Sequence, residues 1–493
     1  MERPLLATTH LLSDIASLLG SPSAKVDCEI TGLTNNSSEV EPGDIFLAFP
    51  GSKVHGANFA KEAKSKGALA VVTDVEGAKL SQELPTIVLS NPRKSAGDLS
   101  AWFYSEPMRD LYSVGITGTN GKTTTTTLLH QIWMGAGRES GLIGTVETRI
   151  GSDVITNART TPESCELQSL IATMRERHLR NVALEVSSHA ISLHRIQGSH
   201  FNIVGFTNLT QDHLDFHASM EEYYLAKKKL FTFEFAELAI INIDSDYGMR
   251  LANEIELPVL RLSRTLTSAD WSYQSITPAT CGTDISIRGM GGILIEGTLP
   301  LHGQYNLDNA LMAIAIAVNS GVDPIEIASL LPQLTPAKGR LEKVDVGQQF
   351  LSFVDYAHTP DAVSAVLRVC REMTHGKVIG VLGCGGDRDA SKRPLMGKAL
   401  LEGSDLAIFT SDNPRSEDPL AILREMIGTA KIVAPNMVIA DRKEAINQAI
   451  SLATNEDVVI VLGKGHETGQ EISGILHPFD DRLVLARAIE SKS

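Results

Sequence analysis

The chain has 493 residues, more than one ordinary hydrophobic core accommodates, and this length predicts about three domains. Hydrophobic residues make up 43% and charged residues 21%, which is typical of a globular protein. The formal net charge of -15 argues against non-specific binding to nucleic acid or anionic membranes, but it does not exclude a local basic site for phosphates.

The five cysteines are scattered along the chain, and no two of them form a CxxC pair. This pattern argues against a disulfide framework or a zinc knuckle and indicates a reducing compartment. The segment Met1–Gly20 lacks the basic start and apolar run of a signal peptide, and no uncharged apolar stretch is long enough to cross a bilayer. We therefore expect a cytoplasmic protein without membrane insertion, and we expect it to act as a monomer.

Composition divides the chain into three predicted α/β domains, at residues 1–99, 100–336 and 337–493. In the first and smallest domain, Pro, Gly and Asn separate short β-like runs at Asp44–Phe49, Ala68–Thr73 and Thr86–Leu89.

The second domain alternates apolar strands with helices, which predicts a mostly parallel sheet covered by helices on both faces. Strands are expected at Tyr112–Thr117, Asn181–Val186, Ile203–Thr207 and Leu238–Ile243, with a β-rich excursion at Ile285–Leu301. Helices are expected at Thr123–Met134 and Asn306–Val318.

The third domain repeats the alternation and predicts a doubly wound α/β unit with a helix at Asp361–Arg371. Its strands are expected at Phe350–Tyr356, Val378–Gly383, Leu406–Thr410, Met437–Ala440 and Val458–Gly463. Ligands of such sheets bind at the carboxyl ends of the strands, and most of the polar motifs fall there.

The sharpest motif is the turn from Gly115 to Thr123, which joins a strand to a helix. Its backbone N–H groups can surround phosphate oxygens, and the helix adds its positive end. Lys122 would neutralise the terminal phosphates and Thr123 would bind Mg²⁺. The turn departs from the strict P-loop pattern, because Ile116 stands where that pattern has glycine. The alternative is a Gly-rich turn that only begins a helix.

Three further residues are candidates for a metal site beside this turn. Glu185 ends a predicted strand, where a carboxylate is well placed to hold Mg²⁺, although a solvated strand end is the alternative. Taken alone, His213 would be a histidine with its hydrogen bonds satisfied, and Lys227 would lie on a solvated helix face.

The segment Thr117–Thr124 resembles the ATP loop of the Mur ligase superfamily, which also includes the folylpolyglutamate synthetases. The resemblance runs through all three predicted domains. It implies a central P-loop-type ATPase domain, in which Asn306 and Asn309 face the ATP base, Arg340 reaches the phosphates and Asp355 the ribose. The implied ATP-binding residues are Gly118, Thr119, Asn120, Gly121, Lys122, Thr123, Thr124, Asn306, Asn309, Arg340 and Asp355.

The same resemblance implies that Glu185 and His213 hold a second Mg²⁺ and that Lys227 is carbamylated. This N6-carboxylation converts a cation into an oxygen ligand, which suits a divalent metal. The implied catalytic residues are Lys122, Lys227, His213 and Arg340.

For the precursor, the resemblance implies a small UDP-binding N-terminal domain that contacts uridine through Ser37. The more usual Asp-Ser-Arg pattern reads Asn36-Ser37-Ser38 here. The residues implied to hold the UDP-sugar peptide are Thr160, Thr161, Ser187 and Arg195.

The third domain carries the motif Asp412-Asn413-Pro414-Arg415. It resembles the signature of family members that add meso-diaminopimelate, whereas lysine-adding members usually have aspartate at the position of Asn413. An arginine can clamp the extra carboxylate of meso-diaminopimelate through paired hydrogen bonds. Arg388, Gly463 and Glu467 match other acceptor-binding positions; each alone could be a loop turn with a surface ion pair.

The resemblance therefore implies an ATP-dependent ligase that adds meso-diaminopimelate to UDP-N-acetylmuramoyl-L-alanyl-D-glutamate through an acyl phosphate. A lysine-adding or folylpolyglutamate-type ligase is one alternative. A P-loop switch, in which hydrolysis drives a change of shape, is another, and a non-catalytic nucleotide-binding module is a third that the metal and acceptor motifs disfavour.

Overall fold

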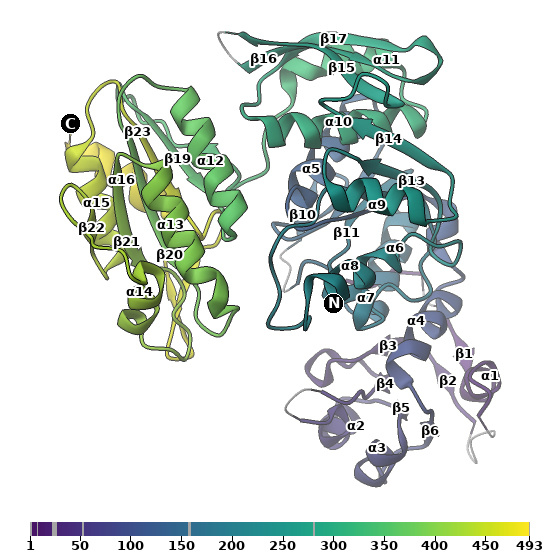
Figure 1. The fold of residues 1–493 in the computed structure, drawn as a ribbon. Helices are drawn as coiled ribbons and strands as arrows, with labels where there is room; N and C mark the ends of the chain where they lie inside the picture. Colours follow the sequence, from purple (N-terminus) through teal and green to yellow (C-terminus); the bar gives the residue numbers. More distant parts are fainter. Residues whose placement is uncertain are drawn as a thin grey trace.

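The computed structural model describes residues 2–6, 8–21, 27–51, 54–155, 159–279 and 282–492. Figure 1 shows three bodies, each built around its own main sheet: an N-terminal body at the bottom, a central body above it and a C-terminal body beside the central one. The α/β architecture predicted from the sequence is confirmed.

The N-terminal body contains a parallel sheet of four strands. In spatial order these are β3 (Gly32–Thr34), β4 (Asp44–Leu47), β5 (Ala70–Thr73) and β6 (Thr86–Val88). Around them lie β1 (His10–Leu11), α1 (Leu12–Leu18), β2 (Glu29–Ile30), α2 (Ala60–Ser65), α3 (Val75–Leu80) and α4 (Pro92–Phe103). The three predicted strands are confirmed, each shorter than predicted by one or two residues.

The central body is organised by a sheet of 11 strands. In spatial order they are β10 (Asp153–Ile155), β9 (Thr148–Ile150), β8 (Ser140–Ile143), β11 (Asn181–Glu185), β7 (Tyr112–Thr117), β12 (Phe201–Phe206), β13 (Ala236–Asn242), β14 (Val259–Ser263), β15 (Trp271–Ala279), β16 (Gly282–Arg288) and β17 (Leu294–Leu299). The run from β8 to β15 is parallel, and both ends are antiparallel.

Two hydrophobic clusters cover the faces of this sheet. One face packs against α5 (Lys122–Gly135), α10 (Gln304–Asn319) and α11 (Pro324–Leu330). The other packs against α6 (Ser164–Glu176), α7 (Ser188–Ser192), α8 (Met220–Lys228) and α9 (Asp246–Glu254). The sequence analysis did not recognise β8, β14 or β15; β8 and β14 have only four and five residues, too few to show a clear period.

The C-terminal body contains a six-stranded sheet whose strands are parallel except for β18. In spatial order these are β18 (Glu342–Lys343), β19 (Leu351–Asp355), β23 (Val458–Leu462), β20 (Val378–Cys384), β21 (Leu406–Ser411) and β22 (Met437–Val438). The helices are α12 (Pro360–Glu372), α13 (Arg393–Gly403) and α14 (Pro419–Ile427) on one face, and α15 (Arg442–Leu452) and α16 (Asp481–Lys492) on the other. A hairpin of β24 (Gly469–Ile472) and β25 (Ile475–Pro478) extends from it. All five strands predicted for this region are present.

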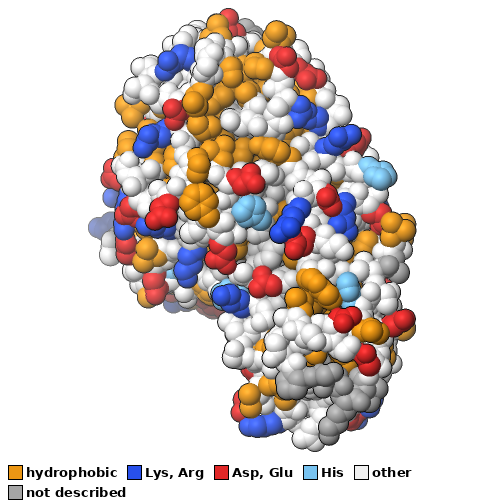
Figure 2. Space-filling view, turned by 90° about the vertical axis from the view of Figure 1, so that its right-hand side faces the viewer, with side chains coloured by type: hydrophobic (Ala, Val, Ile, Leu, Met, Phe, Trp, Pro, Cys, Tyr) orange, Lys and Arg blue, Asp and Glu red, His pale blue; other side chains and the backbone are white. Residues whose placement is uncertain are grey.

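The predicted domain boundaries stay a prediction. Each main sheet draws its strands from a separate stretch of chain, but α4 crosses the expected boundary at residue 99 and buries Ala96, Leu99 and Phe103 in the N-terminal core. In the described residues, no helix is long and apolar enough to span a membrane. The described side chains on the face in Figure 2 mix both signs of charge without an extended basic field.

Candidate active site

The turn between β7 and α5, residues 118–121, is the predicted phosphate-binding loop, called the phosphate loop below. Gly121 immediately precedes α5 with φ 89°, and a Cβ there would lie 2.2 Å from the Asn309 side chain, so the position favours glycine. Lys122 folds back over the loop, donating to the carbonyl oxygens of Gly118 at 2.8 Å and Thr119 at 2.9 Å. The amine is therefore held over the concave side of the loop, where phosphate oxygens would replace the carbonyls as partners.

Glu185 ends β11 directly beside this loop, as the sequence analysis expected. Its carboxylate accepts from the Thr123 hydroxyl at 3.0 Å and from the Thr145 hydroxyl at 2.9 Å, and it also accepts from the Thr145 backbone N–H. Arg340, from the start of the C-terminal region, donates to the same Thr123 hydroxyl at 3.3 Å. One carboxylate, two hydroxyls and one arginine thus meet beside the phosphate loop.

Lys227 is buried and points into the same region from α8. Its Nζ donates to the Gly118 carbonyl at 3.0 Å and to the Thr117 hydroxyl at 3.4 Å, and it lies 4.7 Å from the centre of the Tyr223 ring. Burial lowers the pKa of Lys227 well below its usual value, and the neighbouring Lys122 lowers it further. Burial therefore favours the uncharged form of this amine more than a solvated helix face would.

His213 lies on the loop after β12. Burial lowers the pKa of His213 to about 3, against the opposing effect of Asp212, whose carboxylate lies 3.5 Å from the ring Nε2. The imidazole is therefore neutral, the form that binds metals.

A cavity of about 340 Å³ adjoins the phosphate loop. Its lining includes Asn120, Gly121, Thr124 and Asn309 from the central region, and Arg340 and Asp355 from beyond the domain boundary. The Arg340 guanidinium stacks 4.7 Å from the centre of the Tyr356 ring, and the Asp355 carboxylate accepts from the backbone N–H groups of Leu341 and Ala357. Six of the eleven predicted ATP-binding residues therefore line one cavity, and the others, Gly118, Thr119, Lys122, Thr123 and Asn306, are outside its lining.

A second cavity, of about 430 Å³, lies between the central and C-terminal bodies. It is lined by most of the residues predicted to contact the precursor and the acceptor: Thr160, Thr161, Ser187, Arg195, Arg388, Asp412, Asn413, Arg415, Gly463 and Glu467. Pro414 lies in the same turn, and its carbonyl packs against Gly386, where a Cβ would lie only 2.0 Å away. Residues of the central body and residues of the C-terminal body thus line the same cavity.

Asn413 is held in this cavity by two charged neighbours. Its Oδ1 accepts from the Lys464 ammonium at 3.0 Å, and its Nδ2 donates to the Glu467 carboxylate at 2.7 Å. An aspartate there could not donate to Glu467 and would set two carboxylates side by side. The sequence analysis missed Lys464, which is fully buried, because a lone lysine in a loop carries no periodic signal.

Arg415 is positioned by the adjacent glycine turn. Its Nη1 donates to the Gly386 carbonyl at 2.7 Å, and its Nε lies 3.5 Å from the Glu471 carboxylate. The guanidinium thus keeps donors that are free to bind a carboxylate in the cavity.

Arg195 is positioned by Glu163, which the sequence analysis also missed. The buried Glu163 carboxylate lies 2.9 Å from the Arg195 Nε and accepts from Arg93 of α4 at 2.6 Å. Because Arg93 follows the N-terminal sheet and Arg195 lines the cavity, Glu163 ties the two regions together.

We expect Glu163→Ala to lower the free energy of unfolding by about 2–3 kcal/mol, which is below the range for fully buried pairs because both arginines keep some contact with water. Urea unfolding measures this change. Glu402→Ala, which removes an exposed partner of Lys398, is the matched control and should change stability by less than about 0.5 kcal/mol. Equal effects of the two variants would contradict the role of Glu163.

Two predicted site residues lie elsewhere in the described part of the chain. The Ser37 hydroxyl donates to Glu62 at 2.8 Å on the N-terminal body, outside the lining of both cavities. Asn306 donates to the His302 carbonyl at 2.9 Å in the first turn of α10 and is outside the lining of the nucleotide cavity. Their roles as ligand-binding residues stay predictions.

The predicted metal site also stays a prediction. Within the described ranges, no group of three or more His, Cys, Asp or Glu side chains is arranged to hold a metal ion. The predicted metal ligands are Thr123, Glu185, His213 and Lys227, and only Glu185 and His213 among them belong to those four residue types.

Comparisons with known proteins agree along almost the entire chain. Three family models match: the Mur ligase family, catalytic domain at residues 29–99, the Mur ligase middle domain at 116–317 and the Mur ligase, glutamate ligase domain at 339–465. A relative from Streptomyces coelicolor, named UDP-N-acetylmuramoyl-L-alanyl-D-glutamate--2,6-diaminopimelate ligase, is 45% identical over 99% of this chain and 98% of its own length. A relative of the same name from Aquifex aeolicus is 40% identical, with 92% of this chain and 93% of its own length covered.

Solved structures show the same similarity. A structure titled as that ligase superposes with a TM-score of 0.68 at 30% identity and covers 98% of this chain and 99% of its own. MurF ligase from Thermotoga maritima in complex with ADP, at 18% identity and a TM-score of 0.63, shares the fold over 94% of this chain and 96% of its own. On these grounds the chain belongs to the Mur ligase family of ATP-dependent ligases.

Proposed function

We propose that the chain joins meso-diaminopimelate to UDP-N-acetylmuramoyl-L-alanyl-D-glutamate at the expense of ATP. The observation that supports this most is the cavity between the central and C-terminal bodies, in which the predicted precursor side and the predicted acceptor side face each other. The nucleotide cavity is lined by Asn120 and Gly121 of the phosphate loop and by residues from the same two bodies. The three substrates can therefore meet at one place.

In the proposed reaction, the γ-phosphoryl group of ATP transfers to the side-chain carboxylate of the precursor's D-glutamate, and ADP is released. An amine of meso-diaminopimelate then attacks the acyl carbon, a tetrahedral intermediate forms, and phosphate leaves as the amine loses a proton. Lys122 and Arg340 offset the charge that builds on the phosphoryl oxygens during the first step. Placing both cations before the substrates arrive avoids the cost of reorganising them during the reaction.

The residues beside the phosphate loop fit a magnesium ion. The Thr123 hydroxyl and the Glu185 carboxylate are hard oxygen donors 3.0 Å apart, and the Thr145 hydroxyl adjoins the same carboxylate. We infer that Thr123 and Glu185 would hold Mg²⁺, which would neutralise phosphate charge. His213 is neutral and suited to a second ion.

We also propose that Lys227 carries a carbamate. The low pKa of its amine favours reaction with CO₂, because the uncharged amine is the nucleophile. The carbamate would present oxygens toward the phosphate loop in place of a buried cation.

Recognition of the acceptor follows from the charges around the second cavity. Arg388 and Arg415 are suited to the extra carboxylate of meso-diaminopimelate, and Glu467 to its ammonium group. Asn413 and Lys464 both donate to the Glu467 carboxylate, and Lys464 also donates to Asn413. An aspartate at position 413 would add a negative charge to this part of the cavity, whereas asparagine is neutral. Together these groups favour an acceptor whose far end carries both a carboxylate and an ammonium group, as in meso-diaminopimelate, over lysine, whose side chain ends in an amine alone.

The test is release of phosphate from ATP with Mg²⁺ and the UDP-muramoyl dipeptide, with meso-diaminopimelate or L-lysine as acceptor. Strong stimulation by meso-diaminopimelate alone is the expected result. Stimulation by lysine would refute the acceptor assignment but keep the ligase reaction. A rate of phosphate release that neither acceptor changes would overturn the proposed function in favour of a P-loop switch.

A further inference from the structure

Residues 207–213, the first part of the connection between β12 and α8, are hydrogen-bonded to the phosphate loop along their first half. Thr119 donates its backbone N–H to the Asn208 carbonyl at 2.9 Å, and Asn120 donates its own to the Asn208 side chain at 3.0 Å. The Thr210 N–H donates to the Thr119 hydroxyl at 3.0 Å. Through these hydrogen bonds, a movement of the phosphate loop on binding a nucleotide would also move residues 207–213.

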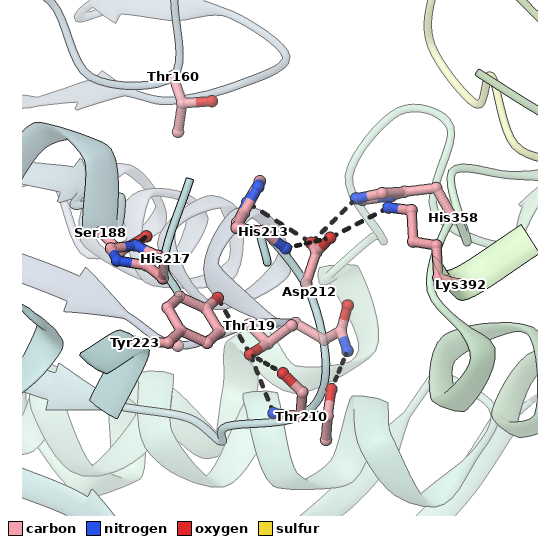
Figure 3. A network of polar contacts seen from close by, with 12 residues as sticks. Thr119, Thr160, Ser188, Thr210, Asp212, His213, His217, Tyr223, His358 and Lys392 are labelled. Carbon is pink, nitrogen blue, oxygen red and sulfur yellow. Dashed lines mark hydrogen bonds and ion pairs between the residues drawn. The ribbon is translucent and has the colours of Figure 1, made fainter. Parts of the chain in front are cut away.

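The second half of this loop contacts the C-terminal body. Figure 3 shows Asp212 between His213 of its own loop and two side chains from that body, His358 and Lys392. The Asp212 carboxylate lies 3.0 Å from the Lys392 ammonium and 3.6 Å from the His358 Nε2. Beside this pair, Gln211 donates to the Ser391 hydroxyl at 3.4 Å.

The Asp212–Lys392 pair is buried on both sides, with the side chains 4% and 11% exposed. Separating the two bodies would break this ion pair and the contact with His358. Substituting one partner while the bodies stay docked would leave the other charge buried without its counter-ion.

Lys392 also belongs to the wall of the acceptor cavity. It closes the short 3₁₀ turn Ala390–Lys392, which Asp389 caps by accepting from the Ser391 N–H at 2.9 Å. Arg388 and Asp389, immediately before this turn, line the same cavity. A shift of Lys392 therefore shifts the arginine predicted to bind the acceptor's carboxylate.

These contacts form one continuous connection from the phosphate loop through Thr210 and Asp212 to Lys392 and the acceptor wall. We propose that Asp212 is a positioning residue whose ion pair with Lys392 couples nucleotide binding to docking of the C-terminal body, and so to acceptor affinity. This inference rests on the proposed ligase function for the identity of the acceptor, but not for the docking itself. Because coupling is reciprocal, the acceptor should tighten nucleotide binding by the same factor by which the nucleotide tightens acceptor binding.

The first test is small-angle X-ray scattering of the full chain with a non-hydrolysable ATP analogue and no acceptor. The unchanged chain is expected to become more compact as the analogue saturates. Lys392→Met should remain expanded at the same saturation, and Lys392→Arg, which keeps the charge, should recover the compaction. Lys398→Met, an exposed lysine on α13, is the matched control and should behave like the unchanged chain. Compaction of Lys392→Met equal to that of the control would overturn the proposal.

The second test is calorimetric binding of the analogue with and without the precursor and meso-diaminopimelate. Linked sites typically affect each other roughly 5- to 150-fold, and Lys392→Met should reduce this factor to about 1. Asp212→Asn combined with Lys392→Met should do no more than either change alone, because the two residues act as a pair. Additive losses would argue against a pairwise connection.

The two tests separate failure of this inference from failure of the proposed function. If neither acceptor stimulates phosphate release, but scattering still shows docking that depends on Lys392, the proposed function alone is wrong. If meso-diaminopimelate stimulates release and Lys392→Met docks normally, the coupling alone is wrong.

Discussion

Lys227→Ala is expected to reduce acceptor-dependent phosphate release by roughly 10²–10³-fold, the range seen when one preorganised electrostatic group is removed from an active site. The lysine is buried against the Gly118 carbonyl, and burial lowers the pKa of its amine, so alanine removes the group proposed to carry the carbamate. Because Lys227 lies outside the lining of the precursor cavity, binding of the UDP precursor should remain close to that of the unchanged chain. Steady-state kinetics and calorimetric binding of the precursor measure the two effects separately.

Lys229→Ala is the matched control, since Lys229 lies exposed two residues further on. It should retain turnover within about twofold, as surface substitutions generally have small effects. Intact-mass measurement of the unchanged chain in bicarbonate buffer should show the addition of one CO₂ unit, and Lys227→Ala should lack it. Near-normal ligation by Lys227→Ala would contradict the proposed role of the carbamate.

Arg415→Met is expected to raise the KM for meso-diaminopimelate by roughly tenfold to a hundredfold, because a hydrogen bond to a charged group contributes about 1.5–3 kcal/mol. Arg415 is held toward the cavity by the Gly386 carbonyl and retains donors for the acceptor's carboxylate. Methionine keeps the length of the apolar stem while removing the charge. The KM for ATP should stay nearly unchanged, because Arg415 lies outside the nucleotide cavity.

The control for this prediction is Arg424→Met, an arginine on α14 of the same body whose side chain is 74% exposed. It should leave both KM values unchanged. A parallel rise in the KM for ATP and for meso-diaminopimelate in Arg415→Met would indicate general damage to the C-terminal body. An unchanged KM for meso-diaminopimelate would remove Arg415 from the acceptor site.

Much of the fold could be predicted from the chain because it depends on local pattern. The apolar runs at β7, β11, β20 and β23 are buried strands, and their alternation with helices requires parallel sheets covered on both faces. Strands such as β14 and β15 escaped prediction, because their side chains are buried only after neighbouring strands have formed.

The residues of the candidate site also divide into those that the sequence predicts and those that it does not. The turn Gly118–Thr123 and the motif Asp412–Arg415 are contiguous, so residue type and spacing alone predict their chemistry. Glu163, Lys464 and the Asp212–Lys392 pair could not be predicted by the same means. Each depends on a contact between residues that lie tens of residues or more apart in sequence.

Sequence by itself determined the domain types and the contiguous motifs, because hydrophobic period and turn chemistry act over a few residues. Only the tertiary structure decided which charges are buried together, because desolvation and ion pairing depend on distances between chain segments that no local pattern specifies.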